Sequence, residues 1–204
     1  MINVYYLKDR NSIFVPNEFD ASLPLHLKEK IENIKHSKTI LQKRKLLYLL
    51  TQVWKADYPN INLVDLYYNE IGKPFLSNNL VISNAYSANI LATTLSFNKF
   101  IGLDAEKILP INLEEYQFYF TKKEWVWMNN DLIKFYTLWT KKEALAKALG
   151  IGMELAFNEI ELLDDEISYG EKDFYFVVKI IDGDFVISVA SNMKDEISFK
   201  EVVL

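Results

Sequence analysis

The stretch DLIKFYTLWTKKEALAKALGIG, residues 131–152, is the strongest helical segment of the chain. Its apolar positions recur every three or four residues, as on one face of an α-helix, and they are Leu132, Phe135, Trp139, Ala146 and Leu149, with the aliphatic part of Lys142. Thr140 and Glu143 also fit a capping box, which would begin the helix at Thr140. The apolar period that runs back to Leu132 favours the longer helix, and Gly150 and Gly152 predict its end.

A polar stripe lies beside the apolar one and consists of Tyr136, Thr140, Glu143 and Lys147. A glutamate four residues before a lysine is common on exposed helices, where the pair contributes only about 0.2–0.5 kcal/mol. Glu143 and Lys147 are therefore either a surface pair or part of a functional site, and the helix alone does not decide between the two.

The composition limits the classes of protein to which the chain can belong. The chain has 204 residues, half of them apolar, which is enough for a sizeable core. It has no cysteine, two histidines and a net charge of −5, which excludes disulfides and thiolate metal sites and argues against binding to duplex nucleic acid. No stretch approaches the ~18 apolar residues of a membrane span, so we expect a cytoplasmic protein without a membrane segment.

The remaining segments predict helices and antiparallel strands in both halves of the chain. We expect a helix over residues 25–55, a Gly-Pro loop at 71–79, a hairpin with its turn at Asp182 and Gly183, and strands over residues 2–7, 80–87, 89–96, 99–108 and 196–204. The predicted fold class is α+β with two lobes of similar size, each with helices packed on a small antiparallel sheet. We place the lobes at residues 1–100 and 101–204.

Acidic residues alternate with apolar ones in IGLDAEKI, residues 101–108. On a strand Asp104 and Glu106 share a face, roughly 6.5–7 Å apart along the backbone. By itself this pattern is typical of the solvated face of an edge strand. Taken with Glu143, the two carboxylates form an all-oxygen set, which suits Mg²⁺ rather than zinc. Lys147 and the basic run Lys43, Arg44, Lys45 would suit a phosphate-bearing substrate.

Four motifs occur together in a recognisable order. They are GKP at residues 72–74, IGLDAE at 101–106, FYFTKKEW at 118–125 and LWTKKEALAKALGIG at 138–152. In order and approximate spacing the chain resembles the 4′-phosphopantetheinyl transferases, in particular the larger, pseudo-dimeric type similar to the surfactin-synthetase activating enzyme. In the long fourth motif the chain has the family's residue at every fixed position. The resemblance implies two pseudo-symmetric α+β lobes with coenzyme A in the cleft between them.

The resemblance also implies roles for individual residues. Mg²⁺ would be held by Asp104, Glu106 and Glu143, and Lys147 would contact phosphate. In the first lobe Arg44 would approach the 3′-phosphate of coenzyme A, and the loop with Lys73 and Pro74 would flank the adenine.

One segment departs from the family pattern. The family usually has Ser-His-Ser before the acidic strand, whereas we align Ala85, Tyr86 and Ser87 with it here. This alignment makes Tyr86 and Ser87 the expected contacts to coenzyme A, with a neutral phenol in place of an imidazole.

The activity that the resemblance implies is Mg²⁺-dependent transfer of the phosphopantetheine arm of coenzyme A to a serine of an apo acyl or peptidyl carrier protein. Adenosine 3′,5′-bisphosphate would be released, and the enzyme would act as a monomer. Glu143 or a metal-bound water is the expected base, with Glu124 as a second candidate. The alternatives are a non-catalytic paralogue that binds coenzyme A or a carrier protein, and an unrelated nucleotidyl transferase with two carboxylates.

Overall fold

The structure is a computed structural model that describes residues 1–8, 15–70, 72–77, 80–152 and 155–203. Residues 71 and 78–79 of the predicted Gly-Pro loop, and residue 204 of the last predicted strand, lie outside this part. The first half of the chain forms β1 (Ile2–Lys8), α1 (Asn17–Ser22), α2 (Leu25–Glu32), α3 (Ser37–Asp57), η1 (Leu63–Asp65), β2 (Leu66–Tyr68), β3 (Pro74–Leu76), β4 (Val81–Ser87) and β5 (Ile90–Ser96). The second half forms β6 (Ile101–Lys107), η2 (Leu113–Tyr119), α4 (Lys122–Met128), α5 (Leu132–Leu149), η4 (Phe157–Glu159), β7 (Glu166–Tyr169), β8 (Lys172–Ile181), β9 (Phe185–Ser191) and β10 (Ile197–Glu201).

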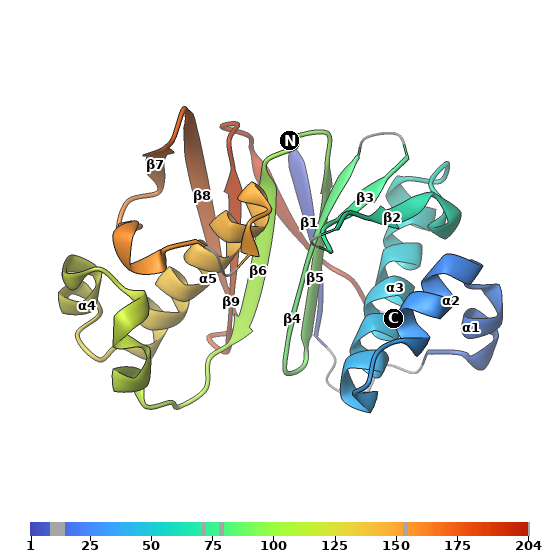
Figure 1. The fold of residues 1–204 in the computed structure, drawn as a ribbon, viewed down its shortest axis with the longest axis horizontal. Helices are drawn as coiled ribbons and strands as arrows, with labels where there is room; N and C mark the ends of the chain where they lie inside the picture. Colours follow the sequence, from blue (N-terminus) through green and yellow to red (C-terminus); the bar gives the residue numbers. More distant parts are fainter. Residues whose placement is uncertain (9–14, 71, 78–79, 153–154, 204) are drawn as a thin grey trace.

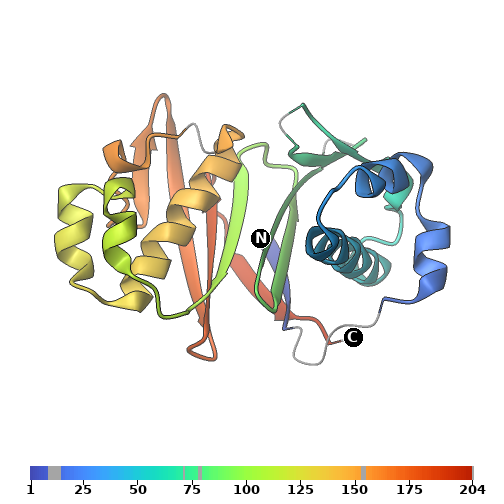
Figure 2. The same cartoon turned by 60° about the horizontal axis from the view of Figure 1, so that its bottom comes forward.

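Two sheets lie face to face in the middle of the molecule, with helices outside both of them (Figures 1 and 2). The first sheet has six strands in the order β10-β1-β5-β4-β3-β2, and the second has four in the order β6-β9-β8-β7. We call the first sheet with α1–α3 the N-terminal lobe, and the second with α4 and α5 the C-terminal lobe. The predicted α+β class with two lobes is confirmed.

Three apolar clusters hold these layers together. One joins α3 to the first sheet, and one joins α5 to the second. The third lies between the two sheets and includes Ile101, Leu103 and Ala105 of β6. The apolar residues of β6 therefore face the other lobe, and the two lobes meet there through apolar side chains.

The C-terminal strand crosses between the lobes. β10 pairs with β1 in parallel, the one parallel pair described in an otherwise antiparallel fold. Lys200 of β10 also forms an ion pair with Asp57, 3.0 Å apart, at the end of α3. The proposed division at residue 100 separates β5 from β6, but it assigns β10 to the second lobe, whereas β10 pairs with the sheet of the first half.

Helix α5 follows the sequence prediction closely. It begins after Asp131, whose carboxylate accepts hydrogen bonds from the backbone N–H groups of Ile133 and Lys134, and it ends at Gly150 with φ of 73°. Thr140 is fully buried inside the helix, so the alternative start there is wrong. The helix lies so close to β6 that a Cβ on Gly102 would be 1.9 Å from the carbonyl oxygen of Ala144. Only glycine allows this approach.

The predicted helix over residues 25–55 is two helices. Asn33 ends α2, and α3 begins at Ser37 after an extended residue, His36. Leu27 of α2 and Leu46, Leu47 and Leu50 of α3 pack into one apolar cluster, so the apolar pattern in the sequence runs across the break without showing it. No helix in the described ranges combines the length and apolar character that a membrane span requires.

Candidate active site between the two lobes

The acidic strand β6 turns its carboxylates toward α5 and not toward solvent. Asp104 is 6% exposed, and its Oδ2 is buried without a hydrogen-bond partner. Glu106 accepts a short hydrogen bond from Ser87 on β4. The pKa of Glu106 is raised to about 7, mainly by burial. The charges of Asp104 and Glu143 act in the same direction, whereas the hydrogen bond from Ser87 and the charge of Lys147 oppose it. The reading of this face as solvated is therefore wrong.

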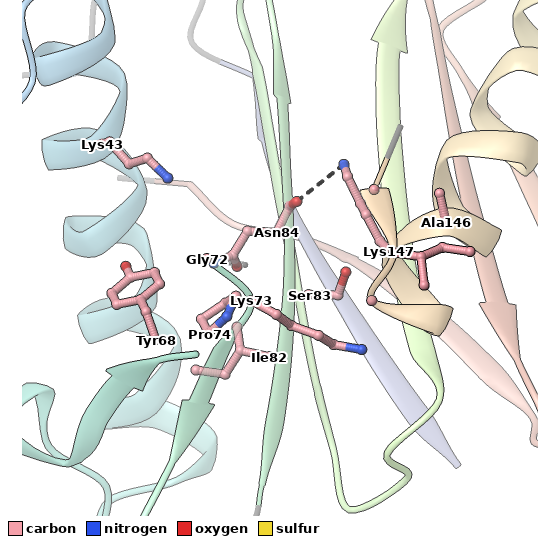
Figure 3. A pocket seen from close by; sticks show the side chains of 13 residues that line it. Lys43, Tyr68, Gly72, Lys73, Pro74, Ile82, Ser83, Asn84, Ala146 and Lys147 are labelled. Carbon is pink, nitrogen blue, oxygen red and sulfur yellow. Dashed lines mark hydrogen bonds between the residues drawn. The ribbon is translucent and has the colours of Figure 1, made fainter. Parts of the chain in front are cut away.

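Helix α5 brings Glu143 and Lys147 to the same place. The Nζ of Lys147 lies 2.7 Å from Oδ1 of Asp104, and it donates to the backbone oxygen of Asn84 on β4 at 3.4 Å (Figure 3). Burial raises the pKa of Glu143, and the charge of Asp104 adds to this effect while Lys147 opposes it. The two residues are therefore part of an inter-lobe cluster and not a surface pair.

The other two residues of the predicted stripe have structural roles. Thr140 lies 2.7 Å from Ser188 through their hydroxyl oxygens and donates to the carbonyl of Tyr136. The phenol of Tyr136 donates to the carbonyl of Leu109. Only the C-terminal half of the stripe therefore reaches the site.

A cavity of about 620 Å³ opens beside this cluster, between the lobes. Figure 3 shows Lys43 of α3 on one side and Lys147 of α5 on the other, with β4 between them. The cavity is lined by Lys43, Tyr68, Gly72, Lys73, Pro74, Ile82, Ser83, Asn84, Ala146, Lys147, Gly150, Ile151 and Gly152. Three lysines around a pocket beside buried carboxylates suit a polyanion that is bound together with a cation.

Comparisons with known proteins show similarity to one family. The sequence model of the 4′-phosphopantetheinyl transferase superfamily matches residues 100–190, which include β6, α5 and both site carboxylates of β6. The chain is also 29% identical over 175 residues to the 4′-phosphopantetheinyl transferase gsp of Aneurinibacillus migulanus, covering 78% of this chain and 70% of that protein. By both comparisons the chain is similar to 4′-phosphopantetheinyl transferases. The inter-lobe pocket is its candidate ligand site.

The basic residue of α3 that reaches the pocket is Lys43 and not Arg44. Arg44 forms a two-pronged ion pair with Asp20 of α1, at 2.8 Å from Nε and 2.5 Å from Nη2. Lys43 lines the pocket, and burial lowers its pKa, as do the charges of Lys30 and Lys147. The expectation that Arg44 meets the 3′-phosphate stays a prediction, and Lys43 is the residue of α3 that the pocket favours for this contact.

The residues of β4 that line the pocket also differ from those expected from the sequence. Ser83 and Asn84 line the pocket, whereas Tyr86 is 36% exposed outside the lining and Ser87 bonds to Glu106. Asn84 is fixed by Thr93, whose hydroxyl donates to Oδ1 at 2.7 Å. The side chains of Tyr86 and Ser87 are therefore not placed to bind a ligand in this pocket.

Glu124 has a structural role instead of the catalytic one considered from sequence. It is fully buried and forms a 2.9 Å ion pair with Lys142. Its carboxylate also accepts from the backbone N–H groups of Thr121 and Leu162, each at 2.8 Å. Both oxygens are engaged inside the C-terminal lobe, so the carboxylate is not available to take a proton from a substrate.

The residues present fit a magnesium ion by their chemistry. Asp104, Glu106 and Glu143 offer only oxygen donors, and the buried Oδ2 of Asp104 lacks a partner. As the side chains stand, no group of three or more acidic or histidine residues in the described ranges converges closely enough to hold a metal ion. Lys147 contacts Asp104, and Ser87 contacts Glu106. Both contacts would have to break before these carboxylates could bind a metal ion.

Proposed function

We propose that this protein transfers the 4′-phosphopantetheine arm of coenzyme A to the serine hydroxyl of an apo carrier protein, acyl or peptidyl, and releases adenosine 3′,5′-bisphosphate. The observation that carries the proposal is the inter-lobe pocket. The pocket has a volume of about 620 Å³, with Lys43 on one side and Lys147, which pairs with Asp104, on the other (Figure 3). Residues 100–190 match the sequence model of the 4′-phosphopantetheinyl transferase superfamily.

The two lobes have different tasks in this proposal. The N-terminal lobe, residues 1–100 together with β10, holds the nucleotide end of coenzyme A. Lys43 meets the 3′-phosphate as a charged donor, and Asn84 adds an amide. The loop of Lys73 and Pro74 covers the adenine. Both walls come from one chain, so the monomer is a complete enzyme.

The C-terminal lobe, residues 101–204 without β10, carries the reaction. Asp104, Glu106 and Glu143 would hold Mg²⁺, which when bound acts as a Lewis acid on the pyrophosphate of coenzyme A. The serine oxygen forms a bond to the phosphorus that bears pantetheine, and the bond from that phosphorus to the bridging oxygen breaks. Glu143, or a water held beside it, takes the serine proton, because a hydroxyl needs a general base to become a nucleophile. Lys147 offsets the charge that gathers on the leaving phosphate.

Intact-mass measurement of a carrier protein tests the proposal directly. Purified protein, coenzyme A and MgCl₂ are incubated with an apo acyl carrier protein and, separately, an apo peptidyl carrier protein. We expect one phosphopantetheinyl group to be added and adenosine 3′,5′-bisphosphate to appear in equal amount. Carrier in which the acceptor serine is alanine is the control. Binding of coenzyme A without any mass gain on either carrier would favour the non-catalytic paralogue.

A further inference from the structure

Lys73 is the residue that reaches across the pocket. It belongs to the loop before β3 in the N-terminal lobe, and Figure 3 shows its side chain extended away from Lys43. Its Nζ donates to the carbonyl oxygen of Ala148 on α5 at 3.1 Å and to that of Lys99 at 3.4 Å. Lys99 lies in the crossover between β5 and β6. The ammonium group therefore contacts the other lobe and the crossover that leads to it.

The contact at Ala148 satisfies a helix end. The last carbonyls of a helix have no donor inside the helix and need one from elsewhere. At the end of α5 the carbonyl of Ala146 is served by the backbone N–H groups of Gly150 and Ile151, at 2.9 and 3.2 Å. The carbonyl of Ala148 receives the ammonium of Lys73. A positive charge at a helix C-terminus is also favoured by the helix dipole.

We propose that Lys73 is a positioning residue that caps α5 from the opposite lobe and fixes the helix turn that carries Lys147. Lys147 is the neighbour of Ala148, so a shift of this turn moves the ammonium that faces Asp104. Burial lowers the pKa of Lys73 to about 8, which agrees with an ammonium enclosed between protein groups. The kinetic part of the proposal rests on the proposed transferase function, whereas its structural part does not.

A direct phosphate contact and a positioning contact predict different results. A residue that binds coenzyme A equally in the ground and transition states raises KM when removed and leaves kcat alone. A residue that places Lys147 affects a charge contact that strengthens in the transition state, so its loss lowers kcat. Lys73→Met separates these cases because methionine keeps much of the apolar chain and removes the donor.

Hydrogen exchange on the complete chain tests the structural part without any substrate. We expect Lys73→Met to speed exchange at Gly150 and Ile151 by about tenfold or more, because their hydrogen bonds depend on an ordered last turn. Lys73→Arg should retain most of the protection. Lys55→Met, a change at an exposed lysine of α3, is the matched control and should change nothing. Should Lys73→Met fail to fold, Lys73→Gln is used and should show intermediate protection.

Kinetics of the same variants complete the test. We expect Lys73→Met to lower kcat about tenfold with KM for coenzyme A changed less than about twofold, and Lys73→Arg to restore most of kcat. Unchanged exchange at Gly150 and Ile151 in Lys73→Met would overturn the proposal, as would a rise in KM with kcat intact. If the unmodified protein transfers nothing to any carrier, the proposed function fails, while the exchange result still decides whether Lys73 caps α5.

Discussion

Two lysines of helix α5, Lys142 and Lys147, lie five residues apart, and each pairs with a carboxylate in a different setting. Lys142 and Glu124 are both fully buried, 2.9 Å apart, and every strong donor and acceptor around them is matched: Lys142 also donates to the carbonyls of Phe157 and Ile160, each at 2.6 Å. Lys147 and Asp104 are 2.7 Å apart, but Lys147 is 32% exposed and Asp104 keeps an unmatched oxygen.

The contrast distinguishes a structural ion pair, Lys142–Glu124, from the ion pair of the candidate site, Lys147–Asp104. A buried ion pair with all its hydrogen bonds made has nothing left to offer a ligand, and breaking it leaves an uncompensated charge. A pair at a pocket edge with an unmatched oxygen can exchange partners when a cation and a phosphate arrive. Both lysines come from the same motif, so motif membership alone does not distinguish the two pairs.

The largest expected effect is at Asp104. Asp104→Asn keeps the shape of the side chain and removes the charge that would hold Mg²⁺, a contribution of several kcal/mol. We expect transfer to a carrier protein to fall by about a thousandfold or more, with the melting temperature nearly unchanged, since Lys147 remains partly solvated. Near-normal turnover at low Mg²⁺ would show that Asp104 is not a metal ligand.

The second change addresses the structural pair. Lys142→Met leaves Glu124 charged and buried, which should lower the free energy of unfolding by about 3–5 kcal/mol, as measured by urea denaturation. The double variant Lys142→Met, Glu124→Gln should recover part of this loss, because no uncompensated charge remains. Folded protein of the double variant should retain transfer activity. A double variant that is stable but inactive would mean that Glu124 takes part in the reaction after all.

The third change removes the lysine of the functional pair. A hydrogen bond to a charged group contributes about 1.5–3 kcal/mol, so Lys147→Met should lower kcat about 10- to 100-fold, with a smaller change in KM. The free energy of unfolding should fall less than in Lys142→Met, because Lys147 is 32% exposed whereas Lys142 is fully buried. Steady-state kinetics and denaturation on one sample decide between this result and a stability effect like that of Lys142.

Much of this arrangement follows from the sequence, and the exceptions have physical causes. The period of α5 predicts the helix and its end, and the alternation of β6 predicts the apolar face that meets the other lobe. The burial of Asp104 on the opposite face follows from neither period, because it depends on the packing of α5 over that face. The basic run Lys43, Arg44, Lys45 does not show which residue faces the pocket. Neighbours on a helix point about 100° apart, and only packing on the sheet fixes the rotation.

Two further errors arise from contacts between distant segments. Asn84 and Tyr86 lie on the same face of β4, since side chains repeat every two residues, so alternation alone cannot tell which one is level with the pocket. The capping box of Thr121 and Glu124 is visible in FTKKE, residues 120–124. The pairing of Glu124 with Lys142 depends on how α4 packs against α5, which no local pattern encodes.

The fourth change compares neighbours on α3. Lys43→Met should reduce discrimination between coenzyme A and its 3′-dephospho form by about tenfold in kcat/KM, because a charged donor to the 3′-phosphate is lost. Arg44→Met breaks the ion pair with Asp20 and should lower stability while it keeps most of the discrimination. Equal discrimination in unmodified protein and Lys43→Met, together with its loss in Arg44→Met, would restore Arg44 as the phosphate contact.

The smallest expected effect is a pH dependence introduced on β4. The Oδ1 of Asn84 accepts from Thr93, which leaves the amide NH₂ as the group that can donate to a ligand in the pocket. An amide does not titrate, so affinity for coenzyme A should depend little on pH between about 6 and 8 through this position. Asn84→His places a group with an ordinary pKa of about 6.5 there. Affinity, measured by calorimetry, should then rise a few-fold as the pH falls and the imidazole becomes charged.

Tyr86→His is the matched control, because it introduces the same group on the same strand face two residues further on. Tyr86 does not line the pocket, so its histidine variant should bind coenzyme A like the unmodified protein at every pH. Burial lowers the pKa of Lys43, but any change in that charge occurs in all three proteins and cancels in the comparison. A pH-dependent affinity in Tyr86→His but not in Asn84→His would show that the ligand meets β4 two residues later than the pocket indicates. The phenol would then stand where the family has its histidine.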